Sequence, residues 1–289
     1  MGEHISSVEC RRDFLMPELP EVETVRRILE PQIAGRTVEK LTIRRPEVIA
    51  FPSPELFEQN IAGQTAAGMN RRGKFLEILL KNGGRIVLHL RMTGCLLAAP
   101  PDYPEEKHTH IIFVLSGGLE LRFSDTRRFG RFWYIAPNEM DSVSGTDKLG
   151  IDPFDERLTA GYLQKSFGRR TKSIKECLLE QGIVAGIGNI YSDEILFSAK
   201  INPRRPANSL TLTEWRRLCR VIPQRLLYYI DKNCMTPQDY LAGHGRDYRN
   251  TPFLQVYGHD GEPCPVCQTT LCKTIQGGRS CVFCPKCQK

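Results

Sequence analysis

The feature that most constrains this 289-residue sequence is a cluster of six cysteines within its last 26 residues. Two Cys-Pro-x-Cys knuckles, Cys264 with Cys267 and Cys284 with Cys287, are separated by 16 residues. Each knuckle presents two thiolates on one tight turn, so two knuckles complete a tetrahedron around Zn²⁺. We therefore predict one structural Zn²⁺, held by Cys264, Cys267, Cys284 and Cys287 in a C-terminal zinc ribbon.

The same cluster leaves a second register open, because Cys281 and Cys284 also form a C-x2-C pair. We favour Cys284 with Cys287, since its Cys-Pro-x-Cys form mirrors the first knuckle. Cys272 and Cys281 then have no assigned role. Zinc ribbons are usually structural and often contact nucleic acid, so the zinc site alone does not identify a function.

Composition excludes several classes of protein. The apolar fraction of 40% and charged fraction of 25% are those of an ordinary globular protein. No apolar run approaches the roughly 20 residues that span a bilayer, so we expect no membrane association. The 11 cysteines are an odd number, and the first 15 residues do not resemble an export signal, which favours the reducing cytoplasm. The net charge of +7 is compatible with a polyanionic partner or with simple solubility.

Residues 36–136 have the pattern of an antiparallel β domain. Two Gly-Gly turns, at 82–84 and 116–118, indicate hairpins and therefore a sandwich or barrel rather than a parallel α/β sheet. One helix, predicted over Glu21–Ile33, precedes the strands because its apolar residues recur on one stripe. The predicted strands are Thr37–Ile43, Phe75–Leu80, Arg85–Leu90, His110–Leu115 and Leu119–Phe123.

The remainder of the chain changes character twice. Residues 137–153 are polar and contain Gly and Pro, as interdomain linkers do. Helical periodicity follows, and the expected helices are Leu158–Phe167, Ser173–Gln181, Asn189–Ala199 and Leu212–Lys232. We therefore predict an α+β multidomain chain. Its parts are an N-terminal extension (1–16), a β-sandwich domain (17–136), a linker (137–153), a helical domain (154–253) and a zinc finger (254–289).

From Met16 the sequence reads MPELPEVET, which resembles the N terminus of the formamidopyrimidine-DNA glycosylase family of bacterial base-excision repair enzymes. The resemblance covers residues 16–289, and further similar strings follow in order: RGKF (72–75), HLRMTG (89–94), DTRRFG (125–130), VAGIGNIY (184–191) and the cysteine knuckles. It implies a two-layered β-sandwich and a helix-two-turn-helix domain carrying a zinc hairpin, with DNA in the cleft between them.

The resemblance also implies the catalytic groups. The nucleophile would be the secondary amine of an N-terminal Pro17, Glu18 would move protons, Lys74 would reach the lesion or its phosphates, and Arg279 would hold a phosphate. An α-amino group is chemically suited to attack, because its pKa lies near 7.7–8 rather than the roughly 10.4 of lysine. Glu21, one helical turn from Glu18, would support the site.

Pro17 is internal in this sequence, and an internal proline nitrogen is an amide without a free lone pair. We therefore expect that translation starts at Met16 or that the extension is removed, so that Pro17 becomes the first residue. A chain that keeps residues 1–15 would lack the nucleophile.

Reaction requires the damaged base to leave the stack, and the hole must be filled. The resemblance assigns this filling to Met92, Arg127 and Phe129, with Arg127 reading the opposite cytosine. Asn189 is a candidate phosphate donor. His89, Lys172, Arg72 and Lys175 are lesser phosphate candidates, and each could equally be an ordinary solvated residue. The glycines before Asn189 open a helix whose N terminus favours an anion, which here would be a phosphate; alternatively Asn189 caps the helix.

The leading interpretation is a bifunctional glycosylase and β,δ-lyase that acts on oxidised purines, namely 8-oxoguanine and formamidopyrimidines. Its expected partner is duplex DNA that contains oxidised bases or abasic sites. We expect the protein to act as a monomer in the bacterial cytoplasm, in association with the nucleoid. The alternatives are the oxidised-pyrimidine specificity of the endonuclease VIII branch, a non-catalytic damaged-DNA binder, and a zinc-ribbon transcription factor, which leaves residues 17–130 unexplained. The sequence differs from the residues usual in the family at three places: Thr126, His259 and residues 242–253. Recognition of the extruded base is expected within residues 242–253.

Overall fold

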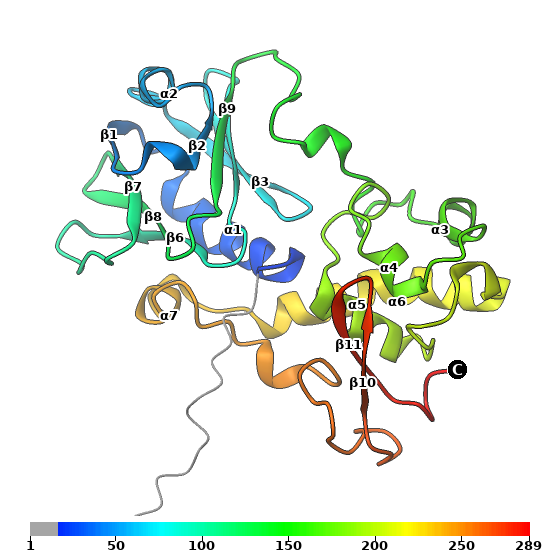
Figure 1. The fold of residues 1–289 in the computed structure, drawn as a ribbon. Coiled ribbons are helices and arrows are strands. Elements are labelled where there is room, and N and C mark those ends of the chain that lie inside the picture. Colours follow the sequence, from blue (N-terminus) through cyan, green and yellow to red (C-terminus); the bar gives the residue numbers. More distant parts are fainter. Residues whose placement is uncertain (1–16) are drawn as a thin grey trace, which may run out of the picture.

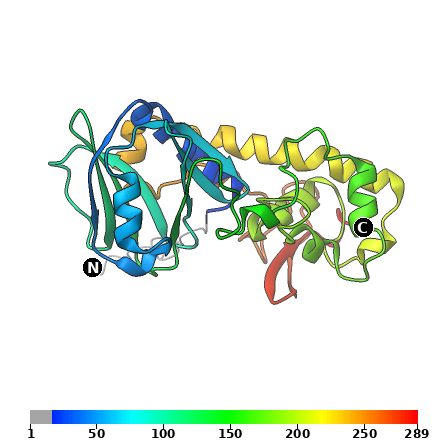
Figure 2. The same ribbon diagram turned by 90° about the horizontal axis from the view of Figure 1, so that it is seen from above.

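The computed structural model describes residues 17–289, so the extension predicted for residues 1–16 lies outside the described residues. A β-rich half and a helical half lie side by side, and a small hairpin projects from the helical half (Figures 1 and 2). The helices are α1 (Leu19–Ile33), α2 (Pro54–Ile61), α3 (Ala160–Phe167), α4 (Ile174–Leu178), α5 (Asn189–Ser198), α6 (Leu212–Lys232) and α7 (Pro237–Ala242). The strands are β1 (Val38–Ile43), β2 (Ile49–Phe51), β3 (Ala66–Arg72), β4 (Phe75–Leu80), β5 (Arg85–His89), β6 (Gly94–Ala99), β7 (Thr109–Leu115), β8 (Leu119–Asp125), β9 (Arg131–Ile135), β10 (Cys272–Gln276) and β11 (Arg279–Phe283).

The β-rich half is a sandwich of two sheets, ordered β1-β7-β8-β6 and β2-β9-β5-β4-β3. Every pair is antiparallel except β2 with β9. Apolar side chains from both sheets, such as Leu88, Phe113 and Phe132, fill the space between them. The predicted fold class is therefore confirmed, and all five predicted strands are present. Four strands and α2 were not predicted in this half, because their apolar patterns are short or interrupted.

Helix α1 joins the two halves. It begins two residues before the predicted start, at Leu19, because Glu18 caps its first turn through a hydrogen bond from the Glu18 backbone N–H to the Glu21 carboxylate (2.9 Å). Val25 and Leu29 pack into the sandwich core, whereas Leu19 packs into the core of the helical half. The first turn of α1, with Pro17 and Glu18 before it, is thereby placed at the junction of the halves.

Helix α5 is buried along most of its length, although it carries two adjacent acids. Asp193 accepts hydrogen bonds from the Val282 backbone N–H (3.0 Å) and the Cys281 thiol (3.2 Å), which fixes β11 to the helix. Glu194 accepts hydrogen bonds from the backbone N–H groups of residues 255–257. Each acid therefore anchors one segment of the C-terminal region, and neither is left unpaired.

Lys175 does not contact solvent and is not a phosphate ligand, contrary to the sequence-based expectation. Its ammonium is completely buried and donates to Asp193 Oδ1 (2.6 Å) and to the Ser280 carbonyl (2.8 Å). A lysine is buried only when it is paired, and here the pair ties α4 to α5 and to the hairpin.

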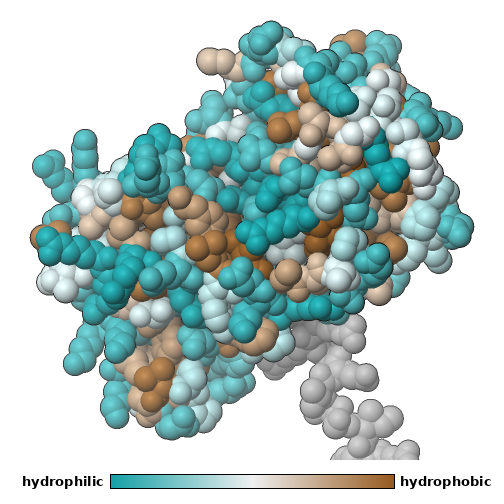
Figure 3. Space-filling model, turned by 180° about the vertical axis from the view of Figure 1, so that it is seen from behind, coloured by the Kyte–Doolittle hydropathy of each residue, from teal (hydrophilic) through white to brown (hydrophobic). Residues whose placement is uncertain are grey.

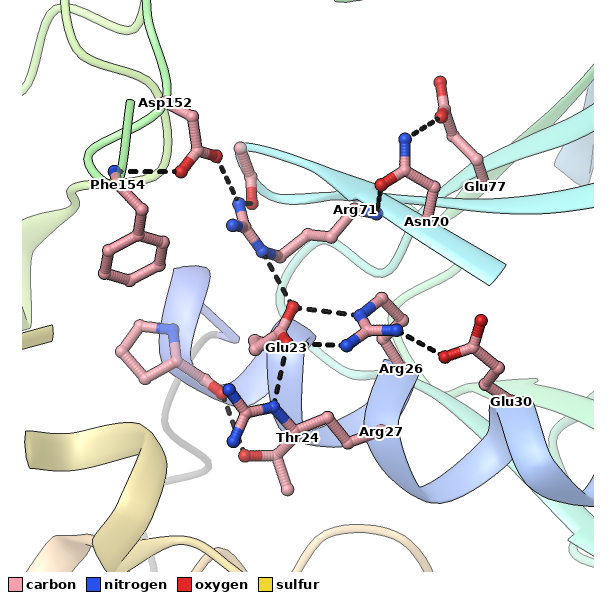
Figure 4. A network of polar contacts seen from close by, with 12 residues as sticks. Glu23, Thr24, Arg26, Arg27, Glu30, Asn70, Arg71, Glu77, Asp152 and Phe154 are labelled. Atoms are coloured by element: carbon pink, nitrogen blue, oxygen red, sulfur yellow. Dashed lines mark hydrogen bonds and ion pairs between the residues drawn. The ribbon is translucent and has the colours of Figure 1, made fainter. Parts of the chain in front are cut away.

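Arg72 is also committed to the protein itself. Its guanidinium donates to the carbonyls of Leu149 (2.9 Å) and Gly150 (2.7 Å), so it holds the 137–153 segment rather than a phosphate. The neighbouring Arg71 reaches Glu23 on α1 (3.1 Å) and Asp152 (2.9 Å), as Figure 4 shows. Together these arginines fix the connection between the halves beside α1.

The face opposite the hairpin, seen in Figure 3, intermixes hydrophilic and hydrophobic side chains. Within residues 17–289, no helix has the length and apolar character needed to cross a bilayer.

Candidate active site and nucleic-acid interface

Glu18 occupies the N terminus of α5. Its buried carboxylate accepts hydrogen bonds from the backbone N–H groups of Ile190 (3.1 Å) and Tyr191 (3.4 Å). The partial positive charge of a helix N terminus stabilises a carboxylate there. The Ile190 and Tyr191 N–H groups are therefore occupied by the protein's own Glu18, which comes from the residue before α1. Phosphate binding by the other groups at this helix start stays a prediction.

Gly188 makes this approach possible. A Cβ at position 188 would lie 2.3 Å from the Glu18 carboxyl carbon and 2.4 Å from Lys74 Nζ, so both groups would have to move away to accommodate it. Gly188, and not Asn189, is the N-cap of α5. The glycine therefore marks the point where Lys74 converges with Glu18, the residue that follows the buried Pro17 in the sequence.

Lys74 stands between positive and negative neighbours. Burial lowers the pKa of its ammonium; the Glu18 carboxylate acts in the opposite direction, and Arg279 adds to the lowering. A lysine in this setting is more readily deprotonated than an exposed one.

A pocket of about 230 Å³ joins four of the predicted residues, which come from four separate segments. Lys74 lies just before β4, His89 ends β5, Asn189 begins α5 and Arg279 begins β11. Asn189 Nδ2 lies 3.4 Å from Ser280 Oγ, which links α5 to the hairpin at the pocket rim. The pocket thus presents an ammonium, a guanidinium and an amide on one concave surface, a set suited to phosphate oxygens.

His89 contributes no charge to this pocket. Burial lowers the pKa of its imidazole to about 3, with Arg91 and Lys74 adding to the effect. Its Nδ1 accepts a hydrogen bond from the Arg91 backbone N–H (2.9 Å), so the neutral ring carries its proton on Nε2. His89 can therefore donate one hydrogen bond to an anion but cannot neutralise it.

Met92, Arg127 and Phe129 form a second cluster on the β-rich half. Arg127 lies over the Phe129 ring, with 4.9 Å from its guanidinium carbon to the ring centroid, and its Nη1 is 3.0 Å from Met92 Sδ. Met92 is 37% exposed and Phe129 is 47% exposed, which is unusual for large apolar side chains. An exposed thioether, guanidinium and phenyl ring in mutual contact are suited to insert between bases.

Lys172 belongs to neither group. Its side chain is 62% exposed, its ammonium lies 3.5 Å from Glu180, and it does not line the pocket. Its role as a phosphate contact stays a prediction.

The four predicted zinc ligands converge, and their sulfur atoms all lie within 4.8 Å of one another. Zn–S bonds of 2.3 Å at tetrahedral angles give sulfur separations of about 3.8 Å. The observed separations of 3.9 Å between Cys264 and Cys287 and of 3.5 Å between Cys267 and Cys284 fit that geometry. The predicted zinc site is thereby confirmed.

The alternative register is excluded at the same time. The Cys281 thiol is buried against Asp193, and Cys272 is exposed at the start of β10, so neither points to the sulfur cluster.

Comparison with known proteins agrees with this geometry. Residues 16–132 match the formamidopyrimidine-DNA glycosylase N-terminal domain, and residues 149–239 match the H2TH domain of the same enzymes. The formamidopyrimidine-DNA glycosylase of Pelotomaculum thermopropionicum is 43% identical over 95% of this chain and 99% of its own length. That of Moorella thermoacetica is 45% identical over 89% of this chain and 93% of its own.

The chain belongs to the formamidopyrimidine-DNA glycosylase family. Two solved structures of Lactococcus lactis Fpg (MutM) are each 34% identical to this chain, and each match covers 94% of this chain and 100% of the L. lactis chain. The TM-score is 0.86 for a complex with DNA that contains an oxidised pyrimidine and 0.85 for a complex with DNA that contains an AP site. The expected family and enzyme class, a DNA glycosylase, are thus confirmed.

Two residues that surround Glu21 in the glycosylase site were not predicted from the sequence. Glu21 Oε1 accepts from Asn250 Nδ2 (2.7 Å) and from the Tyr191 hydroxyl, all three being buried. Burial raises the pKa of Glu21 to about 7, against the lowering effect of these hydrogen bonds. Tyr191 lay within a recognised string, but Asn250 lies in the divergent 242–253 segment, where no sequence signal pointed to it.

Proposed function

We propose that this glycosylase excises oxidised purines, 8-oxoguanine and formamidopyrimidines, from duplex DNA through a Schiff base on Pro17, followed by β,δ-elimination. The observation that carries the proposal is the convergence of Lys74 with Glu18, the residue after Pro17, at Gly188, where Lys74 and Gly188 both line the cationic pocket.

The chemistry follows from these positions. The Pro17 amine, once free, attacks C1′ of the damaged nucleotide, and the bond from C1′ to the base breaks. Glu18 delivers a proton to the sugar ring oxygen, which opens the ring and leaves an iminium cation on the proline nitrogen. Because this nitrogen has no proton to lose, the cation withdraws electrons from the sugar and promotes loss of the 3′ and then the 5′ phosphate.

The DNA contacts divide into two groups. Lys74, Arg279, Asn189 and His89 line the pocket and hold the phosphates around the extruded nucleotide, with Lys172 as an outlying contact. Met92, Arg127 and Phe129 fill the space it leaves, and Arg127 faces the opposite base. Oxidised-base or abasic-site duplexes are the partners, as they are in the L. lactis complexes, and one chain supplies every group.

The oxidised-pyrimidine specificity is a second candidate, because one L. lactis complex contains an oxidised pyrimidine. Another contains Fapy-dG, a purine lesion. The segment 242–253, which departs from the family wording, lies where this choice is expected to be made.

Borohydride trapping tests the proposal. Chains beginning at Met1 and at Pro17 are incubated with duplexes carrying 8-oxoguanine, a formamidopyrimidine or an oxidised pyrimidine, and the covalent adduct is measured. We expect trapping only with the chain that begins at Pro17, and fastest with the purine lesions. Faster trapping on the pyrimidine would favour the second candidate, and absence of adduct with both chains would leave a DNA-binding protein without catalysis.

A further inference from the structure

We propose that Thr93 and Asp125 are positioning residues that lock the Met92 loop (90–94) and the Arg127–Phe129 loop (125–130) into a single rigid wedge before DNA is bound. The proposal rests on the proposed function in one respect, since it takes the side chains of Met92, Arg127 and Phe129 as the group that replaces the extruded base. Neither Thr93 nor Asp125 is offered as a catalytic residue.

Asp125 is the centre of the arrangement. It ends β8, its side chain is completely buried, and its neighbour across the sheet is Gly94 at the start of β6. Its Oδ1 accepts hydrogen bonds from the Thr93 hydroxyl and from the Arg127 backbone N–H (3.2 Å), and its Oδ2 accepts one from the Gly130 N–H (2.8 Å). One carboxylate thus binds both loops at once.

Thr93 closes the connection from the other loop. Its Oγ1 donates to Asp125 and also accepts a hydrogen bond from the Arg127 backbone N–H (3.1 Å). The N–H of Arg127 is therefore shared between Thr93, next to Met92, and Asp125. Through this pair the backbone of Arg127 is fixed relative to that of Met92, although the two residues are far apart in sequence.

Both loops need such a lock, because their backbones are held in unfavourable conformations. Arg91 (φ 59°) and Arg128 (φ 57°) adopt left-handed conformations, which are unfavourable for a non-glycine residue. Strained residues persist only where surrounding contacts over-determine them, and the hydrogen bonds of Asp125 are such contacts. Hydrogen bonds to a charged acceptor are about twice as strong as neutral ones.

The lock has a consequence for recognition. A wedge that is already assembled loses little conformational freedom on insertion, so binding and base readout do not carry that entropic cost. Because Arg127 reads the base opposite the lesion, a fixed backbone at Arg127 would increase the discrimination between different opposite bases. Asp125 is too deeply buried to touch DNA itself, so any effect of changing it must act through the loops.

The test uses the full chain and a duplex with a tetrahydrofuran abasic analogue, so it requires no chemistry at Pro17. Affinity is compared with cytosine and with adenine opposite the analogue, and 2-aminopurine beside the analogue reports insertion of the wedge. We expect Thr93→Val to reduce the preference for cytosine by roughly tenfold, which corresponds to one lost hydrogen bond to a charged group, and to reduce the fluorescence change. Thr93→Ser, which keeps the hydroxyl, should restore both.

Thr42→Val is the matched control, because Thr42 lies in β1 of the same sandwich and its hydroxyl makes no hydrogen bond within residues 17–289. Asp125→Asn should resemble Thr93→Val. Unchanged preference and fluorescence in folded Thr93→Val would overturn the proposal. If that variant does not fold, hydrogen exchange of the unaltered protein decides: one shared opening rate for residues 90–94 and 125–130 supports a single wedge, and separate rates contradict it. Failure of trapping with normal wedge insertion would instead refute only the proposed catalysis.

Discussion

At the scale of single residues, the site depends on carboxylates whose environments differ. The Glu18 carboxylate accepts hydrogen bonds from two backbone N–H groups at a helix N terminus. The Glu21 carboxylate, which belongs to α1, is instead buried against Tyr191 and Asn250. Burial raises the pKa of Glu21 to about 7, so this group exchanges its proton near neutral pH. Two carboxyl groups three residues apart are thereby suited to different roles, as acid–base pairs in enzymes generally are.

Glu21 should make stability fall as the pH rises. Its pKa is raised in the folded protein, so the stabilising proton is fully present below the ordinary value of 4.5 and is lost as the pH passes through about 7. Relative to Glu21→Gln, the unaltered protein should lose on the order of 3 kcal/mol of unfolding free energy across that interval. Urea denaturation at pH 5 and pH 8 measures the difference, and a pH-independent difference between the two proteins would contradict it.

At the scale of elements, α5 organises the functional half of the molecule. Its N terminus holds Glu18, Asn189 faces the pocket, and Asp193 and Glu194 fix the hairpin and the chain that leads to it. A helix with acids on buried positions is unfavourable in isolation and becomes stable only because each acid is partnered. The position of Arg279 therefore depends on contacts made by β11 with α5.

Removing the cation from this buried network should be costly. Lys175→Met leaves Asp193 buried without its charge partner, and we expect a loss of about 3–5 kcal/mol of unfolding free energy. The double variant Lys175→Met with Asp193→Asn should recover part of the loss, because no unpaired charge remains. Lys172→Met, on an exposed lysine three residues earlier, is the control and should change stability by less than about 0.5 kcal/mol. Equal denaturation midpoints for Lys175→Met and Lys172→Met would show that the buried pair is not needed.

At the scale of the whole molecule, the site is assembled from segments that are distant in sequence. Pro17 and Glu18 come from the start of α1, Lys74 and His89 from the sandwich, Asn189 from α5, and Arg279 from a hairpin near the C terminus. The zinc module has its own small core, which includes Val256, Leu271 and Val282 and packs against Phe197 of α5. Because that core is small, the metal must supply much of its stability.

Zinc removal should therefore release the hairpin and weaken DNA binding without unfolding the sandwich. Cys267→Ser should lose stoichiometric zinc and lower affinity for the tetrahydrofuran duplex, and the log–log salt dependence should become shallower by about one unit as the Arg279 contact is lost. Cys272→Ser, in the same module but outside the sulfur cluster, should keep zinc, affinity and slope. Zinc content is measured with a chromogenic chelator and affinity by titration at several salt concentrations; full zinc occupancy in Cys267→Ser would contradict the assigned ligand set.

The features that could be predicted from the amino-acid sequence are local ones. The two knuckles specified the zinc ligands, the Gly-Gly turns specified an antiparallel sheet, and the ordered strings from Met16 specified the family, because each depends on residues that are near neighbours in the chain. The three-residue strand β2 escaped detection for the same reason, since its stability comes from pairing with β9 rather than from its own pattern.

The contacts that each charged side chain makes depend on the tertiary structure. It showed that the anion at the start of α5 is Glu18, that Lys175 and Arg72 bind the protein itself, and that Asn250 completes the surroundings of Glu21. A charged residue looks the same in sequence whether it faces a phosphate or a buried carboxylate. The choice is made by desolvation and by partners from distant segments, and these exist only once the two halves are folded against α1.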